Sequence, residues 1–230
     1  MEDLILLHGA IGAKSQLQPL ADALKNDFNL HLINFPGHGG KPFPSSPFSI
    51  ELFAHDVLHY MKQNRVANAA VFGYSMGGYV GMYMAAYFPG KISRLITLAT
   101  KFHWDETVAA KEIKMLDAAT IQQKIPAFAK ELELRHAPEN WKELLLHTQR
   151  LLSNLGIDNE LKPADYSRVS TPCLLMLGDR DRMVTLEETV DVYKQLPNGS
   201  LAVLPGTPHA LEKIDPDLIS FYIRRFVRCD

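Results

Sequence analysis

The sequence predicts an α/β fold built on a doubly wound, mostly parallel sheet of six strands. Two observations support this prediction. Short, continuously apolar runs alternate with segments of helical periodicity, which is the pattern of parallel strands that are buried on both faces and joined by helices. From residue 101 to 166 the strand-like runs stop, and they resume from about residue 172. We therefore expect a core of residues 1–100 and 167–230, with a helical lid inserted at 101–166.

The first part of this core contains four expected strands. Their apolar runs occupy residues 3–8, 28–35, 67–73 and 92–99. Helical periodicity follows the first three runs at about 14–26, 50–64 and 76–87, and Ser49 is a suitable N-cap for the second of these helices. The short connections imply right-handed crossovers between parallel strands.

The insertion is expected to be entirely helical. Its helical patterns cover 108–116, 121–132 and 141–155 and are broken by Pro126, Pro138 and Gly156. Because it follows the carboxyl end of a strand, such a segment is placed to cover the edge where open sheets bind ligands. An additional helical layer elsewhere on the surface is the alternative. After the insertion, strands are expected at 172–177 and 201–204 and helices at 186–195 and 216–228.

Composition excludes several kinds of partner. The 230 residues are 47% hydrophobic and 22% charged, with a formal net charge of −2, so nothing favours nucleic acid or an anionic membrane. No stretch approaches the roughly 18 apolar residues of a membrane span. Glu2 and Asp3 stand where a signal peptide carries basic residues. Cys173 and Cys229 lie far apart and suggest neither a metal pair nor a disulfide framework, which favours the cytoplasm. The oligomeric state stays open.

The most informative motif is Gly73-Tyr74-Ser75-Met76-Gly77, between the third strand and its helix. The G-x-S-x-G pattern holds a serine in a sharp, strained turn above the sheet edge, and its glycines keep Cβ atoms out of a crowded space. The amide of Met76 would lie at a helix N-terminus, where unpaired N–H groups and the helix dipole favour negative charge. For the pentapeptide alone, a glycine-rich turn without a chemical role is the alternative.

A serine nucleophile needs a base, and the base works best when a carboxylate fixes its tautomer. The fifth expected strand ends in Gly178-Asp179-Arg180-Asp181, and His209 follows the sixth. Asp179 and Asp181 lie in one loop, so both remain candidates for the acid on this ground. A further loop, His8-Gly9-Ala10-Ile11-Gly12, directly follows the first strand. Its Ala10 amide is a candidate oxyanion donor, with a simple strand-to-helix turn as the alternative.

Over nearly its whole length the chain resembles the α/β-hydrolase family. The motifs H-G-x-x-G at 8–12, P-G-H-G at 36–39, G-Y-S-M-G-G at 73–78, G-D-R-D at 178–181 and P-H at 208–209 occur in family order. The resemblance implies Ser75 as nucleophile, His209 as general base and acid, and Asp181 rather than Asp179 as the acid. It also implies an oxyanion hole from the amides of Ala10 and Met76. The family's strand order is 2-1-3-4-5-6 in this numbering, and its reversal between strands 1 and 3 locates the ligand crevice.

The chain departs from the family pattern in three respects. Its first strand begins almost at Met1, whereas family members usually have two earlier antiparallel strands, so we expect a core that lacks them. Asn34 and Lys41 replace the usual Asp and Ser beside the P-G-x-G loop. The serine at the elbow is unlike haloalkane dehalogenases and epoxide hydrolases, which use a carboxylate nucleophile.

Two other sequence patterns resemble known binding motifs but are incomplete. Gly40-Lys41 is no phosphate loop, because G-x-x-x-x-G-K-[ST] requires glycine where Phe35 stands and a hydroxyl where Pro42 stands. His55 and His59 are four residues apart on a helix but lack the neighbouring glutamate and third ligand of a zinc site. We expect no metal site.

Together these residues predict a cofactor-independent serine hydrolase that cleaves a small ester or thioester through an acyl-enzyme. Besides lid residues, the candidate pocket residues are His8, Phe35, Tyr74, Phe102, His103 and Trp104. Two alternatives stay open: a lyase or carbon–carbon bond hydrolase with the same triad, and a ligand receptor on a hydrolase fold. The substrate is a small molecule whose identity depends on the lid, and composition does not reveal it.

Overall fold

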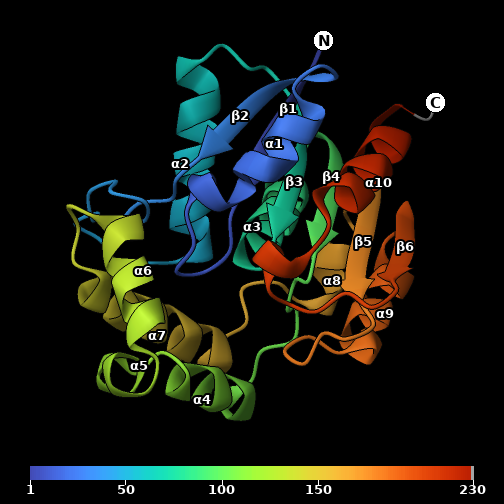
Figure 1. Ribbon diagram of the computed structural model, residues 1–230. Coiled ribbons are helices and arrows are strands. Elements are labelled where there is room, and N and C mark those ends of the chain that lie inside the picture. Colours follow the sequence, from blue (N-terminus) through green and yellow to red (C-terminus); the bar gives the residue numbers. More distant parts are fainter. Residues whose placement is uncertain (229–230) are drawn as a thin grey trace.

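Six parallel strands form the centre of the structure, in the order β2-β1-β3-β4-β5-β6 (Figure 1). The strands are β1 (Glu2–Leu7), β2 (Phe28–Ile33), β3 (Ala69–Tyr74), β4 (Ile92–Leu98), β5 (Cys173–Gly178) and β6 (Gly199–Leu204). The expected strand order is confirmed, and the sheet is fully rather than mostly parallel. This computed structural model describes residues 1–228, so the prediction made for Cys229 lies outside the described residues.

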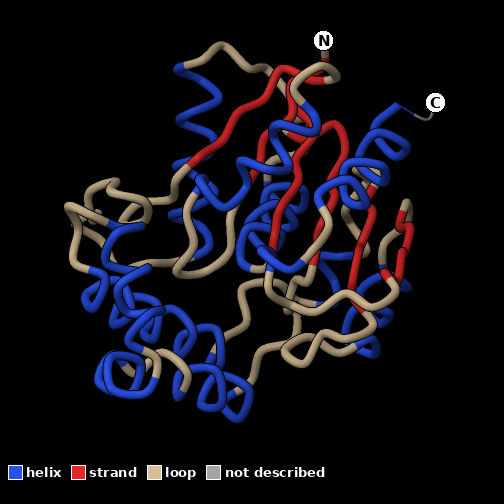
Figure 2. The backbone as a smooth tube through the Cα atoms, in the orientation of Figure 1, coloured by secondary structure: helices blue, strands red, loops and turns tan. Residues whose placement is uncertain are grey.

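Helices cover both faces of the sheet (Figures 1 and 2). One face carries α1 (Gln18–Leu24) and α10 (Pro216–Arg228), and the other carries α2 (Ile50–Gln63), α3 (Met76–Tyr87) and α9 (Leu186–Gln195). Successive strand side chains point to opposite faces. In β1, for example, Leu4 and Leu6 belong to the core under α1 and α10, while Ile5 and Leu7 belong to the core under α2 and α3. Burial on both sides explains the continuous apolar runs of the strands.

The segment 101–166 is helical, and most of it, residues 106–157, lies beyond the carboxyl ends of the strands (Figure 1). It contains α4 (Glu106–Lys114), α5 (Ala118–Lys124), α6 (Pro126–His136), α7 (Trp141–Ile157) and α8 (Pro163–Tyr166). Three of these helices begin after a side chain that accepts a hydrogen bond from the first turn, namely Asp105, Asp117 and Asn140. The helix expected at 121–132 is two helices, because Pro126 lacks an N–H and begins a new helix instead of continuing the old one.

Smaller elements complete the chain. The helix expected at 14–26 begins as a 3₁₀ turn, η1 (Lys14–Leu17), before α1, and a second 3₁₀ turn, η2 (Leu211–Lys213), precedes α10. Within residues 1–228, no helix has the length and apolar character needed to cross a membrane.

Candidate active site

Ser75 lies at the junction of β3 and α3, in a backbone conformation that few L-residues adopt. Its φ is 51° and its ψ is −118°. The neighbouring strand holds this conformation, because the Ser75 amide donates to the carbonyl of Leu98 at 2.8 Å and the Thr100 hydroxyl donates to the Ser75 carbonyl at 3.1 Å. A Cβ on Gly73 or Gly77 would lie 2.4 or 2.5 Å from main-chain atoms. Both glycines are therefore required by close backbone packing around the turn.

His209 and Asp181 are joined by a hydrogen bond of 2.8 Å between Nδ1 and Oδ2. The second carboxylate oxygen of Asp181 accepts from the amides of Met183 and Val184 at 2.8 and 2.9 Å. The Asp181 side chain is 1% exposed, whereas that of Asp179 is 39% exposed. Of the two aspartates that the sequence left open, the structure thus brings Asp181 to the histidine.

The hydrogen bonds determine the charge and tautomer of this pair. Burial raises the pKa of the Asp181 carboxyl, but the hydrogen bonds from His209, Val184 and Met183 outweigh it, and the pKa lies below its usual value. The carboxylate only accepts hydrogen bonds, so Nδ1 of His209 carries the proton. Nε2 then keeps a free lone pair and is available as a base.

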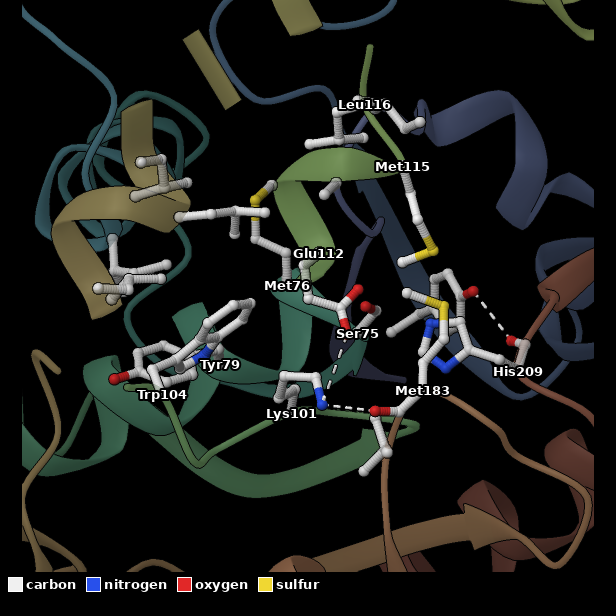
Figure 3. Close-up of a pocket in the computed structure, with 18 of the residues that line it drawn as sticks. Ser75, Met76, Tyr79, Lys101, Trp104, Glu112, Met115, Leu116, Met183 and His209 are labelled. Atoms are coloured by element: carbon white, nitrogen blue, oxygen red, sulfur yellow. Dashed lines mark hydrogen bonds and ion pairs between the residues drawn. The ribbon is translucent and has the colours of Figure 1, made fainter. Parts of the chain in front are cut away.

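Ser75 and His209 line one cavity of about 320 Å³ (Figure 3). The residues implied as oxyanion donors, Ala10 and Met76, line it as well. Most of the remaining wall is apolar, and much of it comes from the turn after α4, with Met115 and Leu116, and from α7, with Leu151, Leu152 and Leu155. The segment 101–166 therefore forms part of the wall of the cavity that Ser75 lines.

The Ala10 loop is held from helix α6. Ile11, the next residue, has a φ of 50°, which is uncommon for a β-branched residue. Its carbonyl accepts from His136 Nε2 at 3.0 Å and from Arg135 Nη1 at 3.3 Å. Nδ1 of His136 accepts from the Gly39 amide at 3.0 Å, so this imidazole must be neutral with its proton on Nε2. Two loops that follow β1 and β2 are thus tied to the same helix end.

Of the pocket residues predicted from the sequence, two line the cavity and a third lies on the surface outside its lining. Tyr74 and Trp104 line the cavity. The Tyr74 hydroxyl also donates to the His209 carbonyl at 2.9 Å, which positions the histidine backbone (Figure 3). His103 is exposed and lies 3.2 Å from Asp105, outside the cavity lining.

The other three predicted pocket residues are buried and do not line the cavity. Nδ1 of His8 donates to the Gly9 carbonyl at 2.8 Å, and its Nε2 accepts from the Phe35 amide at 3.2 Å. Burial lowers the pKa of His8 to about 3, so it is neutral. Phe35 and Phe102 fill the core under α2 and α3. An aromatic residue at a strand end can either pack in the core or contact a ligand, and the sequence pattern does not distinguish between the two.

Sequence reasoning did not identify two charged residues that line the cavity, Lys101 and Glu112. Lys101 follows the end of β4, and Glu112 lies on α4. The signal for Lys101 was present, because a lysine two residues beyond the strand expected at 92–99 is positioned at the ligand-binding edge of the sheet. Glu112 occurs in an ordinary amphipathic helix, whose docking the sequence does not specify.

The rejected motifs have structural explanations. Lys41 Nζ binds Asp56 of α2 at 2.7 Å. His55 and His59 are exposed on α2, and His55 lies 3.8 Å from Glu51. In the described part of the chain, no group of three or more His, Cys, Asp or Glu residues could hold a metal ion.

Known proteins are similar to this chain in sequence and in fold. Residues 4–216 match the family model described as the alpha/beta hydrolase fold. The chain is 29% identical to a pimeloyl-(acyl-carrier protein) methyl ester esterase from Chromobacterium violaceum, over 90% of this chain and 87% of that protein. It is 26% identical to the protein of the same name from Vibrio parahaemolyticus, over 98% of this chain and 94% of that protein.

A solved structure shows the same architecture. The enol-lactonase from Burkholderia xenovorans superposes with a TM-score of 0.78 at 18% identity, covering 98% of this chain and 91% of that chain. At this level of identity the likeness is one of fold.

Proposed function

The chain is a hydrolase of the α/β hydrolase fold family, and we propose that it is a cofactor-independent serine hydrolase that cleaves a small ester or thioester. One observation carries the proposal. The hydrogen-bonded pair of His209 and Asp181 opens onto the same cavity as Ser75, which is held in a strained turn at a helix N-terminus. This combination offers a nucleophile, a base and an orienting acid in one place.

The reaction proceeds in two halves. In the first, Ser75 Oγ attacks the carbonyl carbon of the substrate while Nε2 of His209 takes the hydroxyl proton. The oxyanion of the tetrahedral intermediate accepts hydrogen bonds from the amides of Ala10 and Met76. Collapse of the intermediate breaks the ester or thioester bond. Nε2 returns its proton to the leaving alcohol or thiol, and Ser75 is left acylated.

In the second half, water replaces the leaving group. Nε2 of His209 takes a proton from the water as it attacks the acyl carbon, and Ser75 Oγ leaves with that proton. Asp181 keeps the imidazole in the required tautomer and stabilises the imidazolium formed in each half. All these functions come from the chain's own residues, so no cofactor is needed.

The substrate is a small ester or thioester with a short or medium apolar part. A cavity of about 320 Å³ with mostly apolar walls suits such a group. The two relatives compared above are named as methyl ester esterases, which supports ester cleavage. We also propose that residues 101–166 act as a lid, since helices α4 and α7 form part of the cavity wall.

The proposed compartment is the cytoplasm. Cys173 is a free, buried cysteine, and burial raises the pKa of its thiol to about 12. An unreactive free thiol is compatible with a reducing compartment.

Labelling with a fluorophosphonate probe tests the proposal. We expect the folded wild-type protein to be labelled at Ser75 and the Ser75→Ala variant to remain unlabelled. A panel of esters, thioesters and amides of graded acyl length then ranks the substrates. Equal labelling of both proteins, or no labelling of folded wild type, contradicts the proposal and leaves the lyase and receptor alternatives.

A further inference from the structure

The apolar cavity contains one buried group of charges. Lys101 and Glu112 line it, and their side chains are 13% and 5% exposed (Figure 3). Lys101 Nζ lies 3.8 Å from Oε1 of Glu112 and 3.7 Å from Oε2 of Glu188. The three side chains together carry a net charge of −1, from one ammonium and two carboxylates. A buried group with an excess charge needs an explanation, because burying a charge is costly.

The Lys101 ammonium is already partnered within the protein. Its ammonium has three N–H donors. It donates to the Met183 carbonyl and also faces the carboxylates of Glu112 and Glu188. Only the contact with Met183 is a hydrogen bond, and the two carboxylates are ion-pair partners at 3.8 and 3.7 Å. An anionic substrate group that approached Lys101 would therefore also approach two negative charges.

Glu188 is satisfied by its surroundings. Its Oε1 accepts from the Phe102 amide at 3.2 Å, and its Oε2 accepts from the Thr185 amide at 3.1 Å. It also caps the start of its own helix α9. Both of its carboxylate oxygens therefore have hydrogen-bond partners within the protein.

The Glu112 carboxylate, in contrast to that of Glu188, lacks hydrogen-bond donors among the described residues. Within residues 1–228, its carboxylate accepts no hydrogen bond, and its ion-pair partner Lys101 is 3.8 Å away. A buried carboxylate ordinarily accepts several hydrogen bonds, and an unsatisfied one is costly. Since Glu112 lines the cavity, its free lone pairs are available to a molecule bound there. The cavity wall therefore offers a strong acceptor and a negative field.

We propose that Glu112 forms a substrate subsite that binds a hydrogen-bond donor, a hydroxyl or ammonium group, at the end of an otherwise aliphatic ester. The same subsite rejects esters that carry a carboxylate at that end, because like charges at short range in a buried site repel strongly. The inference rests on the proposed function, since it takes the cavity beside Ser75 as the substrate pocket.

Matched substrates test the preference. Methyl esters of butanoic, hexanoic and octanoic acid are compared in four forms: unsubstituted, or with a terminal hydroxyl, ammonium or carboxylate. At the best chain length we expect kcat/KM for the hydroxyl or ammonium ester to exceed that for the carboxylate ester by about ten-fold or more. In Glu112→Gln this ratio falls by about ten-fold, because the acceptor loses its charge and gains donors. Glu106→Gln removes an exposed charge from the same helix and keeps the wild-type ratio.

A binding measurement separates this inference from the proposed function. Calorimetry on Ser75→Ala, which turns nothing over, compares hexylammonium with hexanoate. We expect hexylammonium to bind more tightly, and the difference to disappear in Ser75→Ala combined with Glu112→Gln. If wild type is not labelled and cleaves no ester, the proposed function fails while this comparison still decides the subsite.

The subsite is overturned by either of two results. One is that the two ions bind with equal affinity, or that hexanoate binds more tightly. The other is that folded Glu112→Gln, verified by circular dichroism, keeps the wild-type ranking of esters.

Discussion

The Nε2–H of His136 donates a 3.0 Å hydrogen bond to the carbonyl oxygen of Ile11, and so joins the end of helix α6 to the residue after Ala10. Ile11 keeps a positive φ of 50° in this arrangement. If the Ala10 amide is an oxyanion donor, then its direction depends on this bond. On that assignment, His136 is a positioning residue that acts through the loop.

Replacement of His136 by leucine should lower kcat with little change in KM. Loss of an entire oxyanion donor costs about 10²-fold or more, so partial displacement of the Ala10 amide should cost about ten-fold. The glutamine variant retains a terminal amide that donates to Ile11, and should recover most of the activity. Steady-state kinetics with one ester checks both variants. Equal losses in leucine and glutamine variants, or a loss confined to KM, would contradict the positioning role.

Stability should fall in acid, because burial lowers the pKa of three histidines, His8, His38 and His136, which are neutral in the folded protein. Burial lowers the pKa of His8 to about 3 and that of His136 to about 4, from 6.5. The ring centroids of His38 and His136 are 6.0 Å apart. The nearby Arg135 and Lys41 cations also disfavour protonation of the buried imidazoles. Since each folded pKa lies below the unfolded one, the unfolded state binds more protons. The contribution of these histidines to the free energy of unfolding is fully present above pH 6.5, and it is lost as the pH falls toward 4 and then 3.

Urea denaturation between pH 7.5 and 4 measures this loss. Each such histidine contributes a slope of at most about 1.4 kcal/mol per pH unit. His136→Gln should flatten the profile between pH 6.5 and 4, because the glutamine does not titrate. An unchanged slope in that variant would show that other groups dominate the acid response.

The two aspartates that the sequence left open should differ sharply in effect. Asp181→Asn keeps the size of the side chain but removes the carboxylate that holds the proton on Nδ1 of His209. We expect kcat/KM to fall by about 10³-fold or more, since the imidazole then loses its tautomer and its stabilising charge. Asp179→Asn, in the same loop but 39% exposed, should stay within about two-fold of wild type. Ester hydrolysis at pH 8 measures both, and comparable losses would refute the assignment of Asp181.

Local sequence patterns predicted the strands and the elbow, because these depend on neighbouring residues, whereas the strand order followed from the resemblance to the α/β-hydrolase family. The glycines around Ser75 and the apolar runs of the strands are visible without knowledge of tertiary packing. The helix break at Pro126 was less clear, since a proline either interrupts a helix or begins one.

Long-range contacts were beyond sequence reasoning. The His136–Ile11 hydrogen bond joins residues 125 positions apart. The charged cavity wall likewise depends on how α4 packs over the end of β4, which brings Glu112 to Lys101. Helical periodicity identifies the buried face of such a helix but not the residues that it meets. The elbow therefore predicts the proposed chemistry, whereas the proposed subsite at Glu112 required the structure.

Gly77 and Gly81 on helix α3 should respond very differently to alanine. A Cβ on Gly77 would lie 2.5 Å from the Leu7 carbonyl oxygen and 2.7 Å from that of His8, both main-chain atoms of the strand and loop beside the elbow. Such atoms cannot move without shifting β1, so the helix must move away from the sheet and take the Met76 amide with it.

A Cβ on Gly81 meets the side-chain Cδ1 of Leu95 at 2.7 Å, and a side chain can change rotamer. We expect Gly77→Ala to lower the free energy of unfolding by about 3 kcal/mol and to slow fluorophosphonate labelling of Ser75. For Gly81→Ala the loss should stay below about 1.5 kcal/mol, because alanine's higher helix propensity offsets about 1 kcal/mol of the repacking cost. Urea denaturation and labelling rates check the pair. If Gly77→Ala labels at the wild-type rate, the close contact between α3 and β1 does not position the nucleophile.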